Sequence, residues 1–178
     1  MNQMNQNQGP IGIFDSGVGG LTVTREIMRQ LPGENLIYFG DTARVPYGSK
    51  SKQTILRYST QIVNFLRTKN VKAIVIACNT ASAYALEELQ QQLDIPIIGV
   101  IWPGAISAAE ATKNKHVGII GTAGTVKSRV YNKYLRKLDP EITVVSKACP
   151  LFVPLVEEGL TEDRVTDDIA KRYLTEFK

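Results

Sequence analysis

A short polar segment, Cys78-Asn79-Thr80, carries the side chains with the clearest capacity for chemistry. It follows a continuous apolar run, residues 71–77, and precedes a segment with helical periodicity. A cysteine between a strand and a helix N-terminus is favoured as a thiolate, because backbone N–H groups and the helix dipole stabilise negative charge there. Such a thiolate can act as a base or a nucleophile. A buried core cysteine is the competing interpretation. Asn79 and Thr80 favour a ligand site, because polar side chains at a strand end are suited to hold a carboxylate.

A second polar segment, Asp15 to Gly20, follows the short apolar run from Ile11 to Phe14. Its glycines permit a phosphate-binding loop, but the segment has neither the dinucleotide-binding spacing nor the Gly-Lys-Ser/Thr of a P-loop, and Asp15 would repel phosphate. An aspartate at a strand end is otherwise a turn or cap residue. With Cys78 expected nearby, a carboxylate that handles protons is the preferred interpretation of Asp15.

Three further features give weaker signals. Pro46-Tyr47-Gly48 is either a plain turn or a contact with the substrate backbone. Cys149 is interpreted as a structural thiol, because Pro150 follows it directly and no polar trio surrounds it. The single histidine, His116, opens an apolar run instead of ending one, which indicates a structural or surface role.

Alternating apolar runs and helical patterns position these residues. Strands are expected near residues 11–14, 36–40, 71–77, 95–101, 116–121 and 141–146, with helices between them and a final helix through Val165, Ile169 and Tyr173. Residues 122–125 are expected to form a loop, followed by one helical face through Val126, Val130, Tyr134 and Leu138. This alternation predicts an α/β fold with a mostly parallel sheet, in which ligands gather at the carboxyl ends of the strands. The three most polar loops, residues 15–20, 41–48 and 78–80, all lie at such ends.

Composition limits the class of protein. The chain has 178 residues, 43% of them hydrophobic, and a net charge of +4. Its basic residues are dispersed among acidic ones, which indicates a solvated surface and no nucleic-acid partner. No stretch reaches the roughly 18 to 20 apolar residues of a membrane span, and the Gln/Asn-rich leader, Met1 to Gly9, is unlike a signal peptide. We therefore expect a cytoplasmic protein with no membrane contact. Two cysteines and one histidine favour neither a disulfide framework nor a metal site.

Four segments together resemble the glutamate racemase family. They are residues 12–20 (GIFDSGVGG), 40–48 (GDTARVPYG), 77–81 (ACNTA) and 149–157 (CPLFVPLVE). Their order along nearly the whole chain makes the resemblance specific. It implies an isomerase that interconverts L- and D-glutamate without a cofactor and supplies D-glutamate for peptidoglycan, and it suggests a homodimer.

The resemblance also implies roles for particular residues. Cys78 matches the thiol that works on D-glutamate, and Asp15 and Glu157 match the carboxylates that assist the two thiols of the family. The expected substrate contacts are Asp15, Ser16, Tyr47, Gly48, Asn79 and Thr80, with Thr122 and Thr125 as less specific matches. No metal is implied.

The resemblance further implies two similar, doubly wound α/β domains with the active site between them, residues 1–98 and residues 99–178. The second domain is expected to be incomplete, because family members carry their second cysteine in a Gly-Cys-Thr-His segment that we expect beyond Lys178. Three alternatives stay open: an aspartate or other amino-acid racemase, a truncated non-catalytic module that binds a ligand or a protein partner, and a nucleotide-binding α/β protein.

Overall fold

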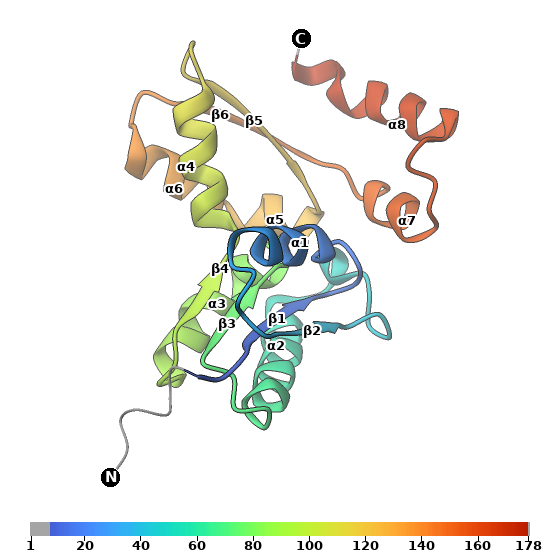
Figure 1. Ribbon diagram of the computed structural model, residues 1–178. Coiled ribbons are helices and arrows are strands. Elements are labelled where there is room, and N and C mark those ends of the chain that lie inside the picture. The colour runs from blue at the N-terminus through green and yellow to red at the C-terminus, as the bar shows by residue number, and fades with distance from the viewer. Residues whose placement is uncertain (1–7, 178) are drawn as a thin grey trace. The chain divides into compact units, whose positions relative to one another are not determined.

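The computed structural model describes residues 8–177, so residues 1–7 of the Gln/Asn-rich leader and Lys178 lie outside the described residues (Figure 1). The chain divides into two compact units, the first ending at Val100 and the second beginning at Ile101. We refer to them as unit 1 and unit 2, and each is described by itself.

Unit 1 is built on a four-stranded parallel sheet in the order β2-β1-β3-β4. The elements in chain order are β1 (Ile11–Asp15), α1 (Leu21–Gln30), β2 (Leu36–Gly40), a 3-10 turn η1 (Tyr47–Ser49), α2 (Lys52–Arg67), β3 (Ala73–Ile76), α3 (Asn79–Gln92) and β4 (Ile97–Gly99). Because β1 lies between β2 and β3, the loops after these three strands come to one edge of the sheet. The α/β fold with parallel strands predicted from the alternating pattern is confirmed.

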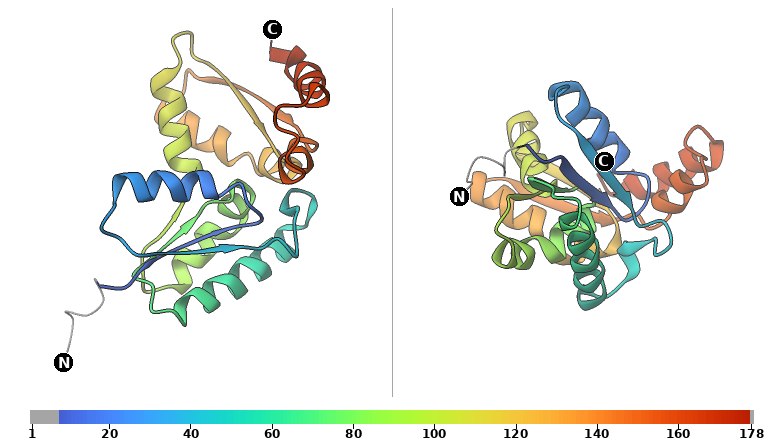
Figure 2. Two further views of the ribbon diagram at one scale, coloured as in Figure 1. Left: turned by 45° about the vertical axis from the view of Figure 1, so that its right-hand side comes forward. Right: turned by 60° about the horizontal axis from the view of Figure 1, so that its bottom comes forward.

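Helices cover both faces of this sheet. The path from β1 to β2 runs opposite to the path from β2 through β3 to β4, so right-handed crossovers place α1 on one face and α2 and α3 on the other (Figure 2). The main core lies between the sheet and the α2–α3 pair. It contains fully buried aliphatic side chains from α2, β3 and α3, for example Ile62, Ile76 and Leu89.

Unit 2 contains a parallel pair of strands, β5 (His116–Gly121) and β6 (Thr143–Ala148). Its helices are α4 (Ile101–Ala111), α5 (Ala123–Ser128), α6 (Val130–Leu138), α7 (Phe152–Glu157) and α8 (Arg164–Leu174), with a final turn η2 (Thr175–Phe177). Its core is small: Ala105 of α4, Leu135 of α6 and Ile142 are buried together. Alternate residues of β5, Val117 and Ile119, pack on that core.

Some predicted boundaries are wrong, each for a local reason. The predicted loop over 122–125 is instead the start of α5, because the Thr122 hydroxyl accepts the Thr125 N–H at 3.2 Å and caps the helix. The predicted helical face from Val126 to Leu138 belongs to two helices, because Arg129 adopts a left-handed conformation between them (φ 55°). Ile101 begins α4 and does not end a strand.

Helix α7 contains a proline, Pro154, as its third residue. A proline is tolerated in the first turn of a helix because the N–H it lacks has no partner there. Among residues 8–177, no helix is both long enough and apolar enough to cross a membrane.

Candidate active site

The three polar loops predicted from the sequence lie at one edge of the sheet of unit 1. Asp15 ends β1, Asp41 follows β2, and Cys78 follows β3 by two residues. The register joins them: the Asp41 N–H donates to the Asp15 carbonyl at 3.0 Å, and the Ala77 N–H donates to the Phe14 carbonyl at 2.8 Å. Strand pairing thus sets the spacing between the aspartates and the cysteine.

The loop after β1 folds around the carboxylate of Asp15. Its Oδ2 accepts the Gly17 N–H at 3.2 Å and the Gly20 N–H at 2.9 Å, and the side chain is buried. Tyr38 of β2 holds the same loop from the other side, because its hydroxyl donates to the Gly17 carbonyl at 2.9 Å. A glycine is required at position 20, since a Cβ there would lie 2.6 Å from the Cβ of Asp15. The loop is therefore rigidly packed on the aspartate.

Cys78 is the N-cap residue of α3. Its Sγ accepts the Ala81 N–H at 3.4 Å, and its thiol donates to the Ser16 Oγ at 3.5 Å. The side chain is 6% exposed. The structure thus brings Cys78, Ser16 and Asp15 together, as the sequence interpretation expected.

The electrostatics of Cys78 correct the sequence analysis, which expected the helix N-terminus to favour the thiolate. Burial, with the negative charge of Asp15 as the next cause, raises the pKa of Cys78 to about 11, while the hydrogen bonds of Ser16 and Ala81 act in the opposite direction. The expectation failed because the desolvation of a thiolate outweighs the favourable N–H groups of the helix terminus. At neutral pH the Cys78 side chain is a thiol.

Of the other predicted substrate contacts in unit 1, Asn79 is exposed at the first position of α3, Thr80 is buried beside it, and Gly48 is half-buried in η1. Tyr47 differs, because its side chain is 1% exposed within the core of unit 1. Its hydroxyl donates a short hydrogen bond to Asp41. Tyr47 therefore offers almost no surface to a ligand, whereas its neighbour Gly48 is only half-buried.

Asp41 and Arg44 surround Tyr47, and the sequence analysis did not single out either residue. The Arg44 Nε donates to the carboxylate of Asp41 at 2.7 to 2.8 Å. One signal for Asp41 was available: it stands directly after β2 as Asp15 stands at the end of β1. No comparable pattern marked Arg44.

The remaining predicted residues belong to unit 2. The hydroxyls of Thr122 and Thr125 lie 3.1 Å apart at the start of α5. Cys149 is buried after β6, with its thiol 3.7 Å from the Lys147 carbonyl oxygen. Glu157 is the half-buried last residue of α7.

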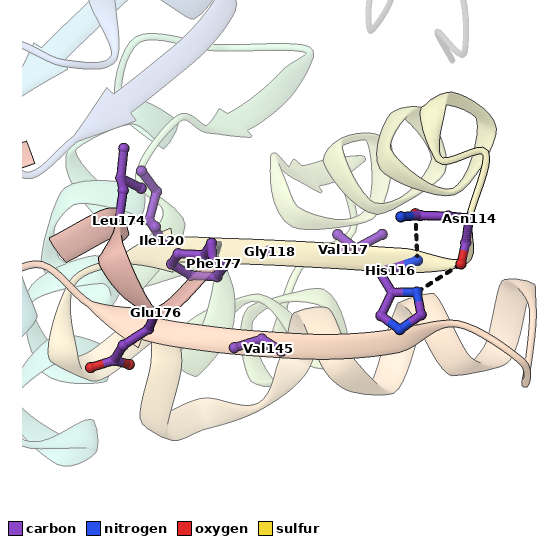
Figure 3. A pocket seen from close by; sticks show the side chains of 9 residues that line it. All are labelled: Asn114, His116, Val117, Gly118, Ile120, Val145, Leu174, Glu176 and Phe177. Atoms are coloured by element: carbon purple, nitrogen blue, oxygen red, sulfur yellow. Dashed lines mark hydrogen bonds between the residues drawn. The ribbon is translucent and has the colours of Figure 1, made fainter. Parts of the chain in front are cut away.

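Unit 2 also has an open hollow of about 540 Å³ beside β5, and none of the predicted site residues lines it (Figure 3). His116, Ile120, Val145 and Phe177 contribute to its walls. Both the N–H and the ring Nδ1 of His116 are bonded to Asn114, at 3.1 and 2.7 Å. The exposed His116 thus has the surface role expected for it. Within residues 8–177, no group of three His, Cys, Asp or Glu side chains gathers to hold a metal ion.

Comparisons with known proteins show the family to which the chain belongs. The family model described as Asp/Glu/Hydantoin racemase matches residues 11–176. A glutamate racemase of Geobacter metallireducens is 58% identical over 165 residues, which are 93% of this chain and 61% of the relative.

Two solved structures extend the comparison. The glutamate racemase of Aquifex pyrophilus aligns with a TM-score of 0.83 at 52% identity, covering 95% of this chain and 66% of the other. The glutamate racemase of Francisella tularensis in complex with D-glutamate aligns with a TM-score of 0.89 at 44% identity, covering 96% of this chain and 64% of the other. The present chain thus spans less than two thirds of the length of these relatives. Because the family match covers both units and every segment that carries the predicted site, the chain belongs to the Asp/Glu/hydantoin racemase family.

Proposed function

We propose that this protein interconverts L- and D-glutamate by moving the α-proton, without a cofactor, and that Cys78 transfers the proton on one face of the amino acid. One observation carries the proposal: Cys78 lies at the N-terminus of α3, in contact with Ser16 and beside the Asp15 loop. A thiol in this position lies near the carboxylate of Asp15, which can assist its deprotonation. The same position lies next to helix N–H groups that suit a substrate carboxylate.

The proton balance follows from the state of the thiol. To make D-glutamate, the Cys78 thiol donates its proton to the planar carbanion formed from L-glutamate and becomes a thiolate. In the reverse direction the Cys78 thiolate removes the α-proton of D-glutamate and becomes a thiol again. Because the pKa of Cys78 is raised, the ligand-free protein carries the thiol form. This is the form that donates the proton in the direction from L- to D-glutamate. A bound α-ammonium group would offset the charge of Asp15 and stabilise the thiolate.

The other groups have roles that fit their positions. We propose that Asn79, Thr80 and the loop after β1 bind the amino acid, and that Asp15 accepts or returns the proton of Cys78. The backbone of Tyr47 and Gly48 contributes a further contact. Glu157 is proposed as the carboxylate that assists proton transfer on the opposite face, and inversion requires a proton-transfer group on that face as well.

The wider context follows from the family. The D-glutamate bound in the Francisella tularensis structure supports glutamate as the substrate. We further propose that the protein is a cytoplasmic homodimer that supplies D-glutamate for peptidoglycan, and that units 1 and 2 correspond to the two α/β domains. Aspartate is the alternative substrate, because the description of the matching family names it too.

The test is the loss of optical activity of L- and D-glutamate, followed by circular dichroism, with L- and D-aspartate measured in parallel. In a protein that also carries the second cysteine of the family, we expect both glutamate enantiomers to approach the racemic signal and both aspartate enantiomers to keep theirs. Cys78→Ser should remove the activity, because a hydroxyl is a far weaker acid than a thiol. Racemisation of aspartate at an equal or higher rate would replace the proposal by the aspartate alternative. Binding of glutamate without any turnover would favour a non-catalytic binding module.

A further inference from the structure

Five side chains of α2 and of the loop that joins β2 to α2 contact one another in a cluster. Its members are Asp41, Arg44, Tyr47, Tyr58 and Gln61, and we call it the Asp41 cluster. Three belong to the loop and two to α2. No step of the proposed proton transfer uses any of these side chains, although Asp41 is 4% exposed and Tyr47 is 1% exposed.

The carboxylate of Asp41 is the centre of the cluster. Its Oδ2 accepts a short hydrogen bond from the Tyr47 hydroxyl, and the Arg44 Nε lies 2.8 Å from Oδ1 and 2.7 Å from Oδ2. Burial, followed by the hydrogen bond to Asp41, raises the pKa of Tyr47 above its usual range. The Tyr47 hydroxyl therefore keeps its proton and remains a donor at neutral pH.

Arg44 joins this centre to helix α2. Its guanidinium carbon lies 4.2 Å from the centre of the Tyr58 ring, and its Nη1 donates to the Gln61 Oε1 at 2.6 Å. The rings of Tyr47 and Tyr58 lie 5.8 Å apart. A planar guanidinium can stack on an aromatic ring and, at the same time, donate hydrogen bonds in its own plane. A lysine ammonium cannot do both.

The cluster is attached to the site at both ends of the loop. At its start, the Asp41 N–H donates to the carbonyl of Asp15 at 3.0 Å. Near its end, Tyr47 precedes Gly48 and its carbonyl accepts the Lys50 N–H at 3.0 Å. The side chain of Tyr47 therefore anchors the backbone that leads into the half-buried Gly48, which the proposed function offers to the amino acid.

We propose that Asp41 and Arg44 are positioning residues that hold the backbone of Tyr47 and Gly48 in the geometry the substrate requires. This inference rests on the proposed function. It assigns the two residues no direct contact with the reacting atoms. They act through Tyr47, whose side chain they anchor to α2.

The test compares Arg44→Lys and Arg44→Met with Arg57→Met as the matched control. Arg57 also stands over the ring of Tyr58, at 5.3 Å, but no bond links it to Asp41 in the described part of the chain. A double variant, Asp41→Asn with Arg44→Met, removes the carboxylate that the single change would leave buried without its cation. Each variant is measured by glutamate kinetics and by backbone hydrogen exchange of residues 41–50.

We expect both Arg44 variants and the double variant to raise KM for glutamate about tenfold, the usual size for losing a supporting residue, with kcat changed less than about twofold. Exchange over residues 41–50 should become faster, while exchange in β1 and β3 stays as in the wild type. Arg57→Met should change neither quantity. A purely structural role would lower the melting temperature without this local exchange or the selective rise in KM.

Two outcomes separate this inference from the proposed function. If the wild type racemises glutamate but the Arg44 variants match Arg57→Met in KM and in exchange, the positioning role is wrong and the proposed function stands. If the wild type has no activity on glutamate, the proposed function fails, and the hydrogen exchange of residues 41–50 decides by itself whether the Asp41 cluster fixes the loop.

Discussion

Cys78 and Cys149 form a natural comparison, because each follows a parallel strand and each is buried. Cys78 caps the long helix α3 and exchanges hydrogen bonds with Ser16 and Ala81. The thiol of Cys149 lies 3.7 Å from the Lys147 carbonyl oxygen, and the charges of Lys147 and Glu176 act on it in opposite directions. Burial raises the pKa of both thiols. Burial at a strand end therefore does not distinguish a candidate base. What distinguishes Cys78 is its place at the start of α3, beside Ser16 and Asp15.

The two units also differ in the size of their buried cores. Unit 1 has fourteen buried residues in one cluster around its sheet, whereas the cluster of unit 2 has three. Helix α8 buries none of its side chains. Asp15 and Cys78 are thus placed on the better packed unit, where a loop can be held rigidly enough to orient a substrate, whereas Glu157 belongs to the other unit.

The largest expected effect tests this difference in packing. Leu89→Ala removes a side chain that is 1% exposed in unit 1, and we expect it to cost about 2 to 5 kcal/mol of unfolding free energy. Val165→Ala on α8, where the side chain is 55% exposed, should change it by less than about 0.5 kcal/mol. Urea unfolding monitored by far-UV dichroism measures both. Equal costs would contradict the difference in burial between α3 and α8.

The pH dependence of stability tests the environment of Cys78. A pKa raised to about 11 means that the folded state holds the thiol proton more tightly than the unfolded chain, whose thiol has a pKa of 9.0. The contribution of Cys78 is therefore fully present below pH 9 and is lost as pH rises through 11, on the order of 2 kcal/mol in total. Cys78→Ala should remove this alkaline loss. The measurement is the difference in unfolding free energy between wild type and variant from pH 8 to pH 11, and an unchanged difference would contradict the raised pKa.

A smaller effect is expected at the glycine that packs on Asp15. Gly20→Ala would place a Cβ 2.6 Å from the Cβ of Asp15 and 2.9 Å from that of Ala77, so the loop must shift. We expect a cost of about 1 to 3 kcal/mol. Gly33→Ala is the control, because no atom lies within 4 Å of its added Cβ. Thermal unfolding of the pair decides, and equal melting temperatures would show that the Asp15 loop is not tightly packed.

The smallest effect concerns the helix caps. The Ser51 Oγ accepts the Thr54 N–H at 3.2 Å at the start of α2, and the Asp163 Oδ1 accepts the Val165 N–H at 2.7 Å at the start of α8. Ser51→Ala should cost about 1 kcal/mol of unfolding free energy. Asp163→Ala should instead release α8 locally, because no residue of that helix is fully buried. Hydrogen exchange of α8 in the two variants distinguishes local from global loss.

Much of the fold could be predicted from the sequence, because continuous apolar strands and helical periodicity directly report a parallel α/β sheet. The proximity of Asp15, Ser16 and Cys78 could also be predicted, because the carboxyl ends of parallel strands lie at one edge of a sheet. The left-handed Arg129 could not be predicted, because only glycine or asparagine signals such a turn in sequence. The Asp41 cluster was missed since its partners, Tyr58 and Gln61, come from the following helix. The raised pKa of Cys78 depends on burial, which a local pattern does not quantify.

Exchange of the α-proton of D-glutamate with solvent in deuterium oxide tests the central claim most directly, because it needs the proton-transfer group of one face only. Proton NMR follows the loss of the α-proton signal for the wild type, Cys78→Ser and Cys149→Ser. We predict exchange in the wild type and in Cys149→Ser, and none above background in Cys78→Ser. Exchange that persists in Cys78→Ser and disappears in Cys149→Ser would contradict the assignment of Cys78 as the base.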